Sequence, residues 1–291
     1  MDQAIAKAQA LIEALNYIRK FRGRIVVVKI GGAVMDEPET MHSLLSDVVF
    51  MATVGLQPII VHGGGKAISA AMSEAGLEVH FVQGQRYTDE RALSIAEHVL
   101  VKQINAQIVQ TINQLGGRAI GMHSLASCVL VAERMFLEGP QGQRIDIGLV
   151  GRVSKVQNEV LCAVCQAGSI PVIAPVARDQ AGVKLNVNAD LAAGKVAGAV
   201  LAEKLVMVSD THGVRTQADE PDSLAPSLTE QQLRELIDRG IISTGMQPKV
   251  QACLEALDAG VGKAHIIDGR LSHSLLLEIY TDKGVGTEIL K

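Results

Sequence analysis

Aromatic residues are scarce in this chain of 291 residues, which has four Phe, three Tyr and no Trp. Proteins that bind single-stranded nucleic acid stack its bases on aromatic side chains, and those that bind duplexes need a basic surface. Here Lys+Arg number 27 against 31 Asp+Glu, for a formal net charge of -4, and no basic run reaches five residues. Nucleic acid is therefore excluded as the main partner.

Long apolar runs are also missing, since no stretch reaches the ~18 residues of a membrane span and no signal-peptide pattern opens the chain. Cys162 and Cys165 have the spacing of a redox or half-zinc motif. They lack a second pair, however, and lie in a segment, 156–167, that has a helical pattern. We therefore expect buried free thiols, no membrane partner and a reducing, cytoplasmic location. The cysteines are Cys128, Cys162, Cys165 and Cys253.

Several catalytic motifs are absent. The three Gly-Lys pairs, at Gly65, Gly194 and Gly262, are followed by Ala, Val and Ala rather than the Ser or Thr of a phosphate-binding P-loop. No GxGxxG follows a predicted strand, which argues against a dinucleotide enzyme. His62 opens an HGGG sequence like the oxyanion loop of some esterases, but the chain has no GxSxG. No protein metal motif is found, so any metal is expected to arrive with a nucleotide.

Glycine is abundant, with 28 residues, and it is concentrated at predicted strand ends. Residues 24–30 form a β-branched run that ends in glycines 31–32. A second apolar run, 58–61, breaks into glycines 63–65 before a helix that starts near Lys66. Strand, glycine turn and helix thus occur twice within fifty residues, which predicts an α/β fold with a mainly parallel sheet and ligands at the carboxyl edge of its strands.

Apolar residues at steps of three and four from Ile5 to Phe21 predict an amphipathic helix that ends at Gly23, before the first strand. No compositional break marks a linker, and we place a lobe boundary near residue 175. Other helices are expected at 40–54, 90–115, 156–167, 229–239 and 248–259. Other strands are expected within 128–147 and at 170–174, 204–208, 264–267 and 285–290.

Each glycine turn has a lysine beside it: Lys29 precedes the first and Lys66 follows the second. Peptide N–H groups at a helix N-terminus, together with an ammonium group, form an anion site suited to phosphate or carboxylate. The alternative is that the glycines only permit sharp turns. Two such turns on neighbouring strands favour the anion site.

Seven motifs in sequence order make the chain similar to the amino acid kinase family over essentially its whole length. Within that family it resembles the members that phosphorylate the side-chain carboxylate of N-acetyl-L-glutamate in arginine biosynthesis. The motifs are Val28-Lys29-Ile30-Gly31-Gly32, Val61-His62-Gly63-Gly64-Gly65, Phe81 to Asp89, Asn186-Val187-Asn188-Ala189-Asp190, Ser209 to Val214, Gly245 to Val250 and His265 to Arg270.

The resemblance implies an open three-layer α/β/α sandwich with a mainly parallel central sheet and an added N-terminal helix. It implies an oligomerisation helix at 1–23, an acyl-amino-acid and dimerisation lobe at 24–175, and an ATP lobe at 176–291. Lys29 and Lys249 would stabilise the transferring phosphoryl group, and Asp190 would orient the two lysines.

The resemblance also assigns the binding residues. Arg86 would bind the substrate α-carboxylate, for which a guanidinium fork is well suited. Four glycines (Gly31, Gly32, Gly64 and Gly65) would supply backbone N–H groups. The substrate set is Gly64, Gly65, Arg86, Asn186 and Asn188. The ATP set is Gly31, Gly32, Ser209, Asp210, Gly213, Gly245 and Met246, with Mg²⁺ held mainly by the nucleotide phosphates.

Chemistry is consistent with these roles, because phosphoryl transfer relies on positioned positive charge and peptide dipoles. An acceptor carboxylate with a pKa of ~4.3 is already ionised at neutral pH and needs no general base. Simpler explanations remain for each side chain: Lys29 as a solvated strand end, Lys249 and Asp190 as helix-start charges, and Arg86 as a surface partner of Asp89 or Glu90.

Two features bear on variation within the family. Ser243-Thr244 precede Gly245 where family members usually have a second glycine. The added side chain is expected to alter how this loop wraps the nucleotide. The N-terminal helix resembles that of arginine-inhibited members, which implies a trimer of dimers. L-arginine would then bind near four residues: Tyr17, His265, Glu278 and Gly284. Alternatively, the helix covers its own subunit's sheet.

Other functions also remain open. One alternative substrate is an aminoadipate derivative, one methylene longer than N-acetyl-L-glutamate. From another class, the chain could be a non-catalytic arginine-binding regulator that keeps the fold. A PII-type signalling protein stays open as a further partner.

Overall fold

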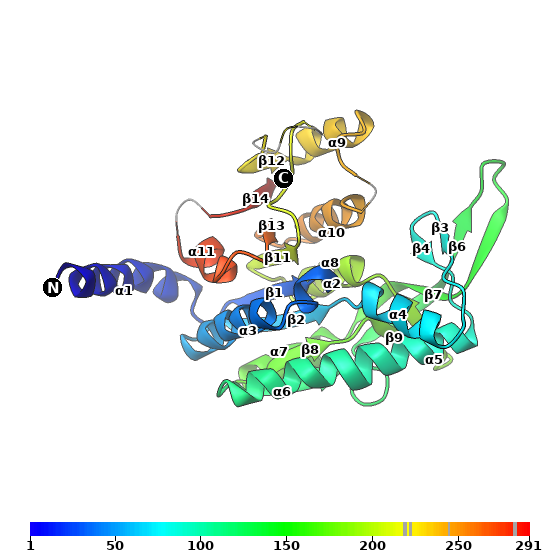
Figure 1. Cartoon of the computed structure of the whole chain (residues 1–291), viewed down its shortest axis with the longest axis horizontal. Helices are drawn as coiled ribbons and strands as arrows, with labels where there is room; N and C mark the ends of the chain where they lie inside the picture. Colours follow the sequence, from blue (N-terminus) through cyan, green and yellow to red (C-terminus); the bar gives the residue numbers. More distant parts are fainter. Residues whose placement is uncertain (218–219, 221–222, 244, 282–283) are drawn as a thin grey trace.

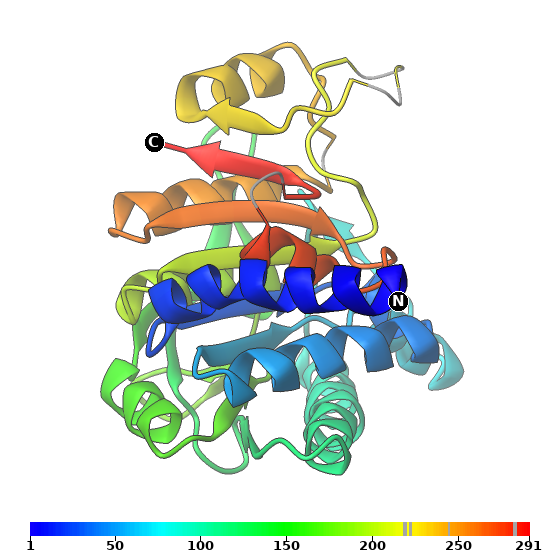
Figure 2. The same ribbon diagram turned by 90° about the vertical axis from the view of Figure 1, so that its left-hand side faces the viewer.

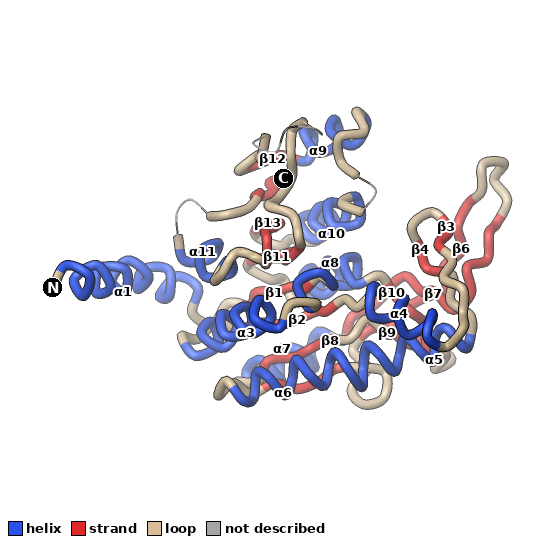
Figure 3. Tube along the Cα trace, viewed as in Figure 1, coloured by secondary structure: helices blue, strands red, loops and turns tan. Residues whose placement is uncertain are grey.

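A computed structural model describes residues 1–217, 220, 223–243, 245–281 and 284–291. Its centre is an eight-stranded sheet with the order β12-β14-β13-β11-β1-β2-β8-β5, flanked by helices (Figures 1 and 3). Among its described strand pairs only β13–β14 is antiparallel. The predicted α/β sandwich with a mainly parallel sheet is therefore confirmed. The strands are β1 (Ile25–Ile30), β2 (Gln57–His62), β5 (Ala119–Met122), β8 (Ile170–Ile173), β11 (Lys204–Ser209), β12 (Ser227–Thr229), β13 (Lys263–Asp268) and β14 (Thr287–Leu290).

Helices cover both faces of this sheet because the strand side chains alternate between them. Val27 of β1 packs in one core cluster with α7, α8 and α10, whereas Val26 and Val28 pack in the other with α3, α6 and α11. Figure 2 shows α3 and α11 in front of the sheet. The helices are α3 (Pro38–Thr53), α6 (Ala106–Gln114), α7 (Asn158–Gln166), α8 (Ala189–Ala199), α10 (Gln247–Asp258) and α11 (Ser274–Tyr280).

Smaller elements complete the chain. Strands β6 (Leu130–Glu138), β7 (Arg144–Val156), β9 (Val176–Arg178) and β10 (Lys184–Val187) form a small closed barrel, and β3 (Phe81–Val82) pairs with β4 (Gln85–Arg86). Because β9 and β10 pair with each other and with β6 and β7, the small barrel extends across the lobe boundary predicted near residue 175. The other helices are α1 (Asp2–Phe21), α2 (Gly32–Met35), α4 (Gly65–Glu74), α5 (Glu90–Glu97), η1 (His98–Asn105) and α9 (Glu230–Asp238).

The helix expected at 90–115 is continuous but not uniform, because its centre, η1, is π-helical. Helix α11 was missed by the sequence pattern. Its N-terminus follows His273, which has a left-handed backbone (φ 57°), and His273 Nδ1 lies 2.6 Å from Asp47 Oδ1 on α3. This contact comes from a residue far away in the sequence, so local cap signals could not reveal it.

Helix α1 projects from the body of the molecule (Figure 1). Tyr17, Ile18 and Phe21 at its end pack against the core, while Leu11 and Ile12 are 69% and 68% exposed. No described helix has both the length and the apolar character needed to cross a membrane.

The expectation of buried free thiols is confirmed only in part. All four cysteines are free, but Cys128 and Cys162 are half-buried, whereas Cys165 and Cys253 are buried.

Candidate active site

Three charged side chains from separate elements meet at the carboxyl edge of the sheet. Lys29 lies near the end of β1, Asp190 in the first turn of α8 and Lys249 in the first turn of α10. Lys29 Nζ is 2.7 Å from Asp190 Oδ1, and Lys249 Nζ is 3.3 Å from Asp190 Oδ2. Their side chains are 6%, 11% and 16% exposed respectively, so Lys29 is not a solvated strand end. One carboxylate thus holds two ammonium groups on opposite oxygens.

Burial controls the ionisation of this cluster. Burial lowers the pKa of Lys29, although the Asp190 carboxylate opposes that shift. Burial by itself raises the pKa of Asp190, but the charges and hydrogen bonds of Lys29 and Lys249 outweigh it, and the pKa lies below its usual value. Asp190 is therefore an anion at neutral pH, which is also favoured by the dipole of α8.

The glycine turns differ in how many N–H groups they offer. Gly31 N–H donates to Val208 O at 3.0 Å, which corrects the expectation that it binds phosphate. Gly32, Gly64 and Gly65 line a cavity of about 400 Å³ together with Lys29. Gly32 and Gly65 begin α2 and α4, where N–H groups have no carbonyl within the helix to bond.

Arg86 lies in the same cavity and is 9% exposed. Its Nη2 donates to Gly65 O at 2.9 Å and to Ser69 Oγ at 2.7 Å, while Phe81 packs 4.8 Å from the guanidinium. Burial lowers the pKa of Arg86, but the group keeps its charge because guanidinium is so strongly basic. Arg86 does not pair with Asp89, which instead caps α5 by accepting from Ala92 N at 2.8 Å.

Asn186 and Asn188 also line the cavity. Asn186 Nδ2 donates to Thr88 Oγ1 at 3.3 Å. Asn188 Oδ1 accepts from the N–H groups of Asp190 and Leu191 and thereby caps α8. The Asn188 oxygen is committed to this cap, so only its amide nitrogen is left to contact a substrate.

Charge in the 400 Å³ cavity is predominantly positive: Lys29, Lys66 and Arg86 face Asp190. Lys66 binds Asp36 at 2.9 Å in an exposed ion pair. The cavity is therefore suited to a small molecule with several negative charges.

A second cavity, of about 280 Å³, is lined by residues between 210 and 270, within the predicted ATP lobe. Asp210, Gly213 and Met246 from the predicted nucleotide set line it. Ser209 is buried, and its Oγ donates to Asp210 Oδ1 at 3.3 Å. Lys249 contacts a lining residue of each cavity, because its Nζ binds Asp190 of the first and its backbone N–H donates to Met246 O of the second at 3.0 Å. Its Nζ also donates to Gly245 O at 3.4 Å. Ser243 lines the second cavity, whereas Thr244 lies outside the described residues.

Sequence reasoning missed His212 and Arg270, which also line this cavity. Both contact the buried Asp268 at the end of β13: His212 Nδ1 lies 3.0 Å away and Arg270 Nη2 2.7 Å away. Asp268 and Arg270 belong to the quoted motif at 265–270, but no spacing rule predicts that they meet His212 across the sheet edge.

A third cavity, of about 260 Å³, lies at the opposite edge of the sheet beneath the end of α1. All four residues of the predicted arginine set line it: Tyr17, His265, Glu278 and Gly284. Glu278 Oε1 is 2.6 Å from His265 Nδ1, and Glu278 Oε2 accepts from Val285 N at 2.8 Å.

Lys204 in the third cavity was not anticipated. It is buried, and its Nζ lies 5.3 Å from the Phe21 ring centre and 3.5 Å from Glu278 O. Burial lowers the pKa of Lys204, while Glu278 raises it. The cavity therefore contains both an ammonium group and a carboxylate.

No group of three or more metal-binding side chains occurs within the described ranges. In the cluster of Lys29, Asp190 and Lys249, both Asp190 oxygens already face ammonium groups. This arrangement fits Mg²⁺ that is carried by nucleotide phosphates rather than held by a protein cage.

Comparison with known proteins identifies relatives over the full chain. The family model for the Amino acid kinase family matches residues 24–268. Acetylglutamate kinase from Heliobacterium modesticaldum is 44% identical over 295 residues, covering 100% of both chains. Acetylglutamate kinase from Caldanaerobacter subterraneus subsp. tengcongensis is 46% identical over 287 residues, covering 99% of this chain and 94% of that one.

Solved structures agree with the fold. N-acetylglutamate synthase from Neisseria gonorrhoeae, complexed with coenzyme A and N-acetyl-glutamate, superposes with a TM-score of 0.86 at 25% identity. The match covers 98% of this chain and 63% of the synthase. Carbamate kinase from Giardia lamblia bound to AMP-PNP has a TM-score of 0.64 at 15% identity, over 92% of this chain and 99% of that one, and shares the fold alone. Given the family match and the end-to-end kinase relatives, this chain is a kinase and belongs to the amino acid kinase family.

Proposed function

We propose that this chain transfers the γ-phosphoryl group of ATP to the side-chain carboxylate of N-acetyl-L-glutamate, in arginine biosynthesis. The observation that carries the proposal is the pair of lysines on one buried carboxylate between two cavities, with Lys29 and Asp190 lining the first. The end-to-end relatives named acetylglutamate kinase support the choice of substrate.

The acceptor has two carboxylates, and the 400 Å³ cavity offers a cation for each. Arg86 is held by Gly65 O and Ser69 Oγ, so its remaining N–H donors are preorganised to bind the α-carboxylate. The side-chain carboxylate would then face Lys29 and the glycine turns. Asn186, which lines the same cavity, would hold the acetamido group.

In the chemical step a carboxylate oxygen attacks the γ-phosphorus, the bond to the ADP oxygen breaks, and an acyl phosphate and ADP result. The acceptor is already ionised, so no side chain needs to remove a proton. Charge spreads over the phosphoryl oxygens in the transition state, where Lys29, Lys249 and the N–H groups of Gly32 and Gly64 stabilise it. Asp190 holds the two ammonium groups at a fixed separation, which avoids the reorganisation of flexible lysines.

The nucleotide would occupy the 280 Å³ cavity, which Met246, Gly213 and Arg270 line. Mg²⁺, when bound to the phosphates, would neutralise part of their charge. Lys249 contacts Gly245 O and Asp190, so it would meet a phosphate chain that passes from one cavity to the other.

A hydroxamate assay tests the proposal, because hydroxylamine traps an acyl phosphate. N-acetyl-L-glutamate with Mg·ATP should give hydroxamate, and N-acetylaminoadipate should give much less. Lys29→Ala should lower kcat by about 100-fold or more, in line with loss of one transition-state donor. Turnover with only the longer acid would identify the aminoadipate alternative, and no turnover with either acid would indicate a non-catalytic regulator. Either result would overturn the proposal.

We also infer that L-arginine inhibits this enzyme by binding in the cavity beneath α1, within a trimer of dimers. Three observations support the inference. The four predicted residues line one cavity, and α1 projects from the subunit. Glu278 and Lys204 supply a carboxylate and an ammonium group, which can pair with the positive and negative charges of a bound amino acid. Residues of both α1 and α11 line the cavity, so a ligand there would contact α1, the helix proposed to link dimers. Turnover measured against L-arginine concentration tests the inference, and an unchanged rate at saturation would count against it.

A further inference from the structure

Beneath the second glycine turn lies a buried pair of side chains that the proposed mechanism does not use. His62 ends β2 and is 0% exposed, and Asn105 ends η1 and is 1% exposed. His62 Nδ1 is 2.9 Å from Gly63 O, and His62 Nε2 is 3.1 Å from Asn105 Nδ2. The same Asn105 nitrogen donates to Val172 O at 2.9 Å.

These contacts determine which imidazole nitrogen carries the proton. Val172 O can only accept, so the Asn105 atom that faces it must be the amide NH₂ group. That group has only hydrogens to offer, and His62 Nε2 must therefore accept. The proton is left on Nδ1, where it is donated to Gly63 O.

The bond to Gly63 O controls a group inside the cavity. Gly63 C=O and Gly64 N–H belong to one planar trans peptide, in which they point in opposite directions. An anchored carbonyl therefore fixes the direction of the Gly64 N–H. Gly64 itself lines the cavity with Lys29, whereas His62 and Asn105 are not among its lining residues.

Helix η1 supports the turn from behind. A Cβ added to Gly64 would lie 2.7 Å from Leu100 and 2.8 Å from Ile104, so the turn is packed directly against η1. The π-helical winding of η1 places Asn105 at its end, in contact with His62. Interruptions of this kind in a helix frequently mark functional positions.

We propose that His62 is a positioning residue for phosphoryl transfer. Its Nδ1–H, held in that tautomer by Asn105, orients the Gly64 N–H toward the transferring phosphoryl group. The inference rests on the proposed kinase function. It differs from a packing role because loss of orientation lowers kcat, whereas loss of packing lowers stability.

Two substitutions of His62 separate these roles. In His62→Asn the amide nitrogen replaces Nδ1 and can still bond Gly63 O. In His62→Gln it replaces Nε2, and the bond to Gly63 O is lost. With N-acetyl-L-glutamate and Mg·ATP, kcat should fall on the order of 10- to 100-fold in His62→Gln but less than about 5-fold in His62→Asn, with the KM for ATP little changed in both. His42→Gln, at an exposed position of α3, is the matched control and should leave kcat unchanged.

Equal kcat values for the two His62 variants would overturn the proposal, as would losses that track only the folded fraction seen by thermal unfolding. A second variant tests the proposal without changing His62. In Asn105→Ala the imidazole is free to move its proton to Nε2, and kcat should fall several-fold. An unchanged kcat in folded Asn105→Ala protein would also overturn the proposal.

A binding measurement distinguishes failure of this inference from failure of the proposed kinase function. Aluminium fluoride added to Mg·ADP mimics the phosphoryl group in transfer. By calorimetry, His62→Gln should bind Mg·ADP as the wild type does but lose the gain in affinity that aluminium fluoride provides. Retention of that gain would overturn the inference. A wild-type protein that shows the gain but does not phosphorylate N-acetyl-L-glutamate would overturn only the choice of substrate.

Discussion

Lys29, Asp190 and Lys249 show what individual residues contribute to this site. The motifs marked all three from the sequence, and the structure brings their charged atoms within 2.7 and 3.3 Å. Their catalytic roles remain predictions. Gly31 corrects one detail, because its N–H is used by Val208 O within the sheet edge. A motif identifies which residue occupies a position but not which of its backbone groups is already bonded.

His62 leads to a pH prediction. Burial lowers the pKa of His62 from 6.5 to about 4. Below pH ~6.5 the unfolded chain takes up a proton that the folded chain refuses, so stability is complete above that pH and falls as the pH drops. Between about pH 7.5 and about pH 4.5, His62 should account for about 2 to 3 kcal/mol of the loss in unfolding free energy.

Urea unfolding of the wild type and His62→Asn at both pH values measures this difference. The carboxyl groups common to both proteins cancel, and the variant should lose less stability on acidification. Parallel losses in the two proteins would show that His62 does not titrate as a buried neutral group.

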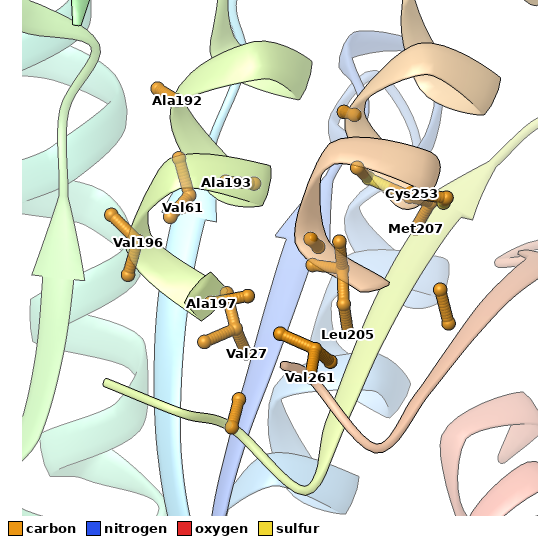
Figure 4. Packing of buried hydrophobic residues seen from close by; sticks show 14 of the residues in the cluster. Val27, Val61, Ala192, Ala193, Val196, Ala197, Leu205, Met207, Cys253 and Val261 are labelled. Atoms are coloured by element: carbon orange, nitrogen blue, oxygen red, sulfur yellow. The ribbon is translucent and has the colours of Figure 1, made fainter. Parts of the chain in front are cut away.

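At the scale of elements, the packing of α8 on α10 places Asp190 beside Lys249. Both helices lie on one face of the sheet, over β1, β2 and β11 (Figure 4). A Cβ added to Gly194 on α8 would lie 2.6 Å from Ala252 O on α10, so the two backbones are in direct contact. Because Asp190 and Lys249 lie in the first turns of α8 and α10, this close approach determines their separation.

Gly194→Ala should therefore move α10 away from α8. We expect a loss of about 1 to 3 kcal/mol in unfolding free energy from overpacking. We also expect kcat to fall about 10-fold or more, because small displacements at a reacting centre are costly. Urea unfolding and the hydroxamate assay measure the two effects.

Lys195→Ala is the matched control on the same pair of helices. It removes only a partly exposed ion pair with Glu255, at 2.9 Å, and leaves the backbones in place. Its effect should stay under about 1 kcal/mol with kcat nearly unchanged. If both variants behaved alike, the helix spacing would not be what positions Lys249.

For the whole molecule, the main feature is the projecting α1. Its exposed Ile5, Leu11 and Ile12 form an apolar side that the subunit itself does not bury. Apolar surface of this kind marks an interaction site, which supports the proposal that α1 joins dimers into a hexamer. The other end of α1 contributes Tyr17 to the proposed arginine cavity.

Deletion of residues 1–20 should accordingly leave active dimers that L-arginine does not inhibit. Sedimentation velocity of the full chain and the truncated chain measures assembly, and the hydroxamate assay with added L-arginine measures sensitivity. The kcat of the truncated chain without arginine should match that of the full chain, because α1 does not line the 400 Å³ cavity. A truncated protein that is still hexameric and inhibited would end the proposal.

The sequence alone was enough for the parallel sheet, its glycine turns and most helices, because these depend on local periodicity and on the special backbone freedom of glycine. It could not reveal η1 or α11, since a π-helical winding and a helix start contacted by the distant Asp47 depend on packing partners far along the chain. Tertiary structure decided two further features: the use of the Gly31 N–H by Val208 O and the tautomer of His62. Each depends on atoms from separate elements meeting in a buried space, where an unpaired polar group would be costly.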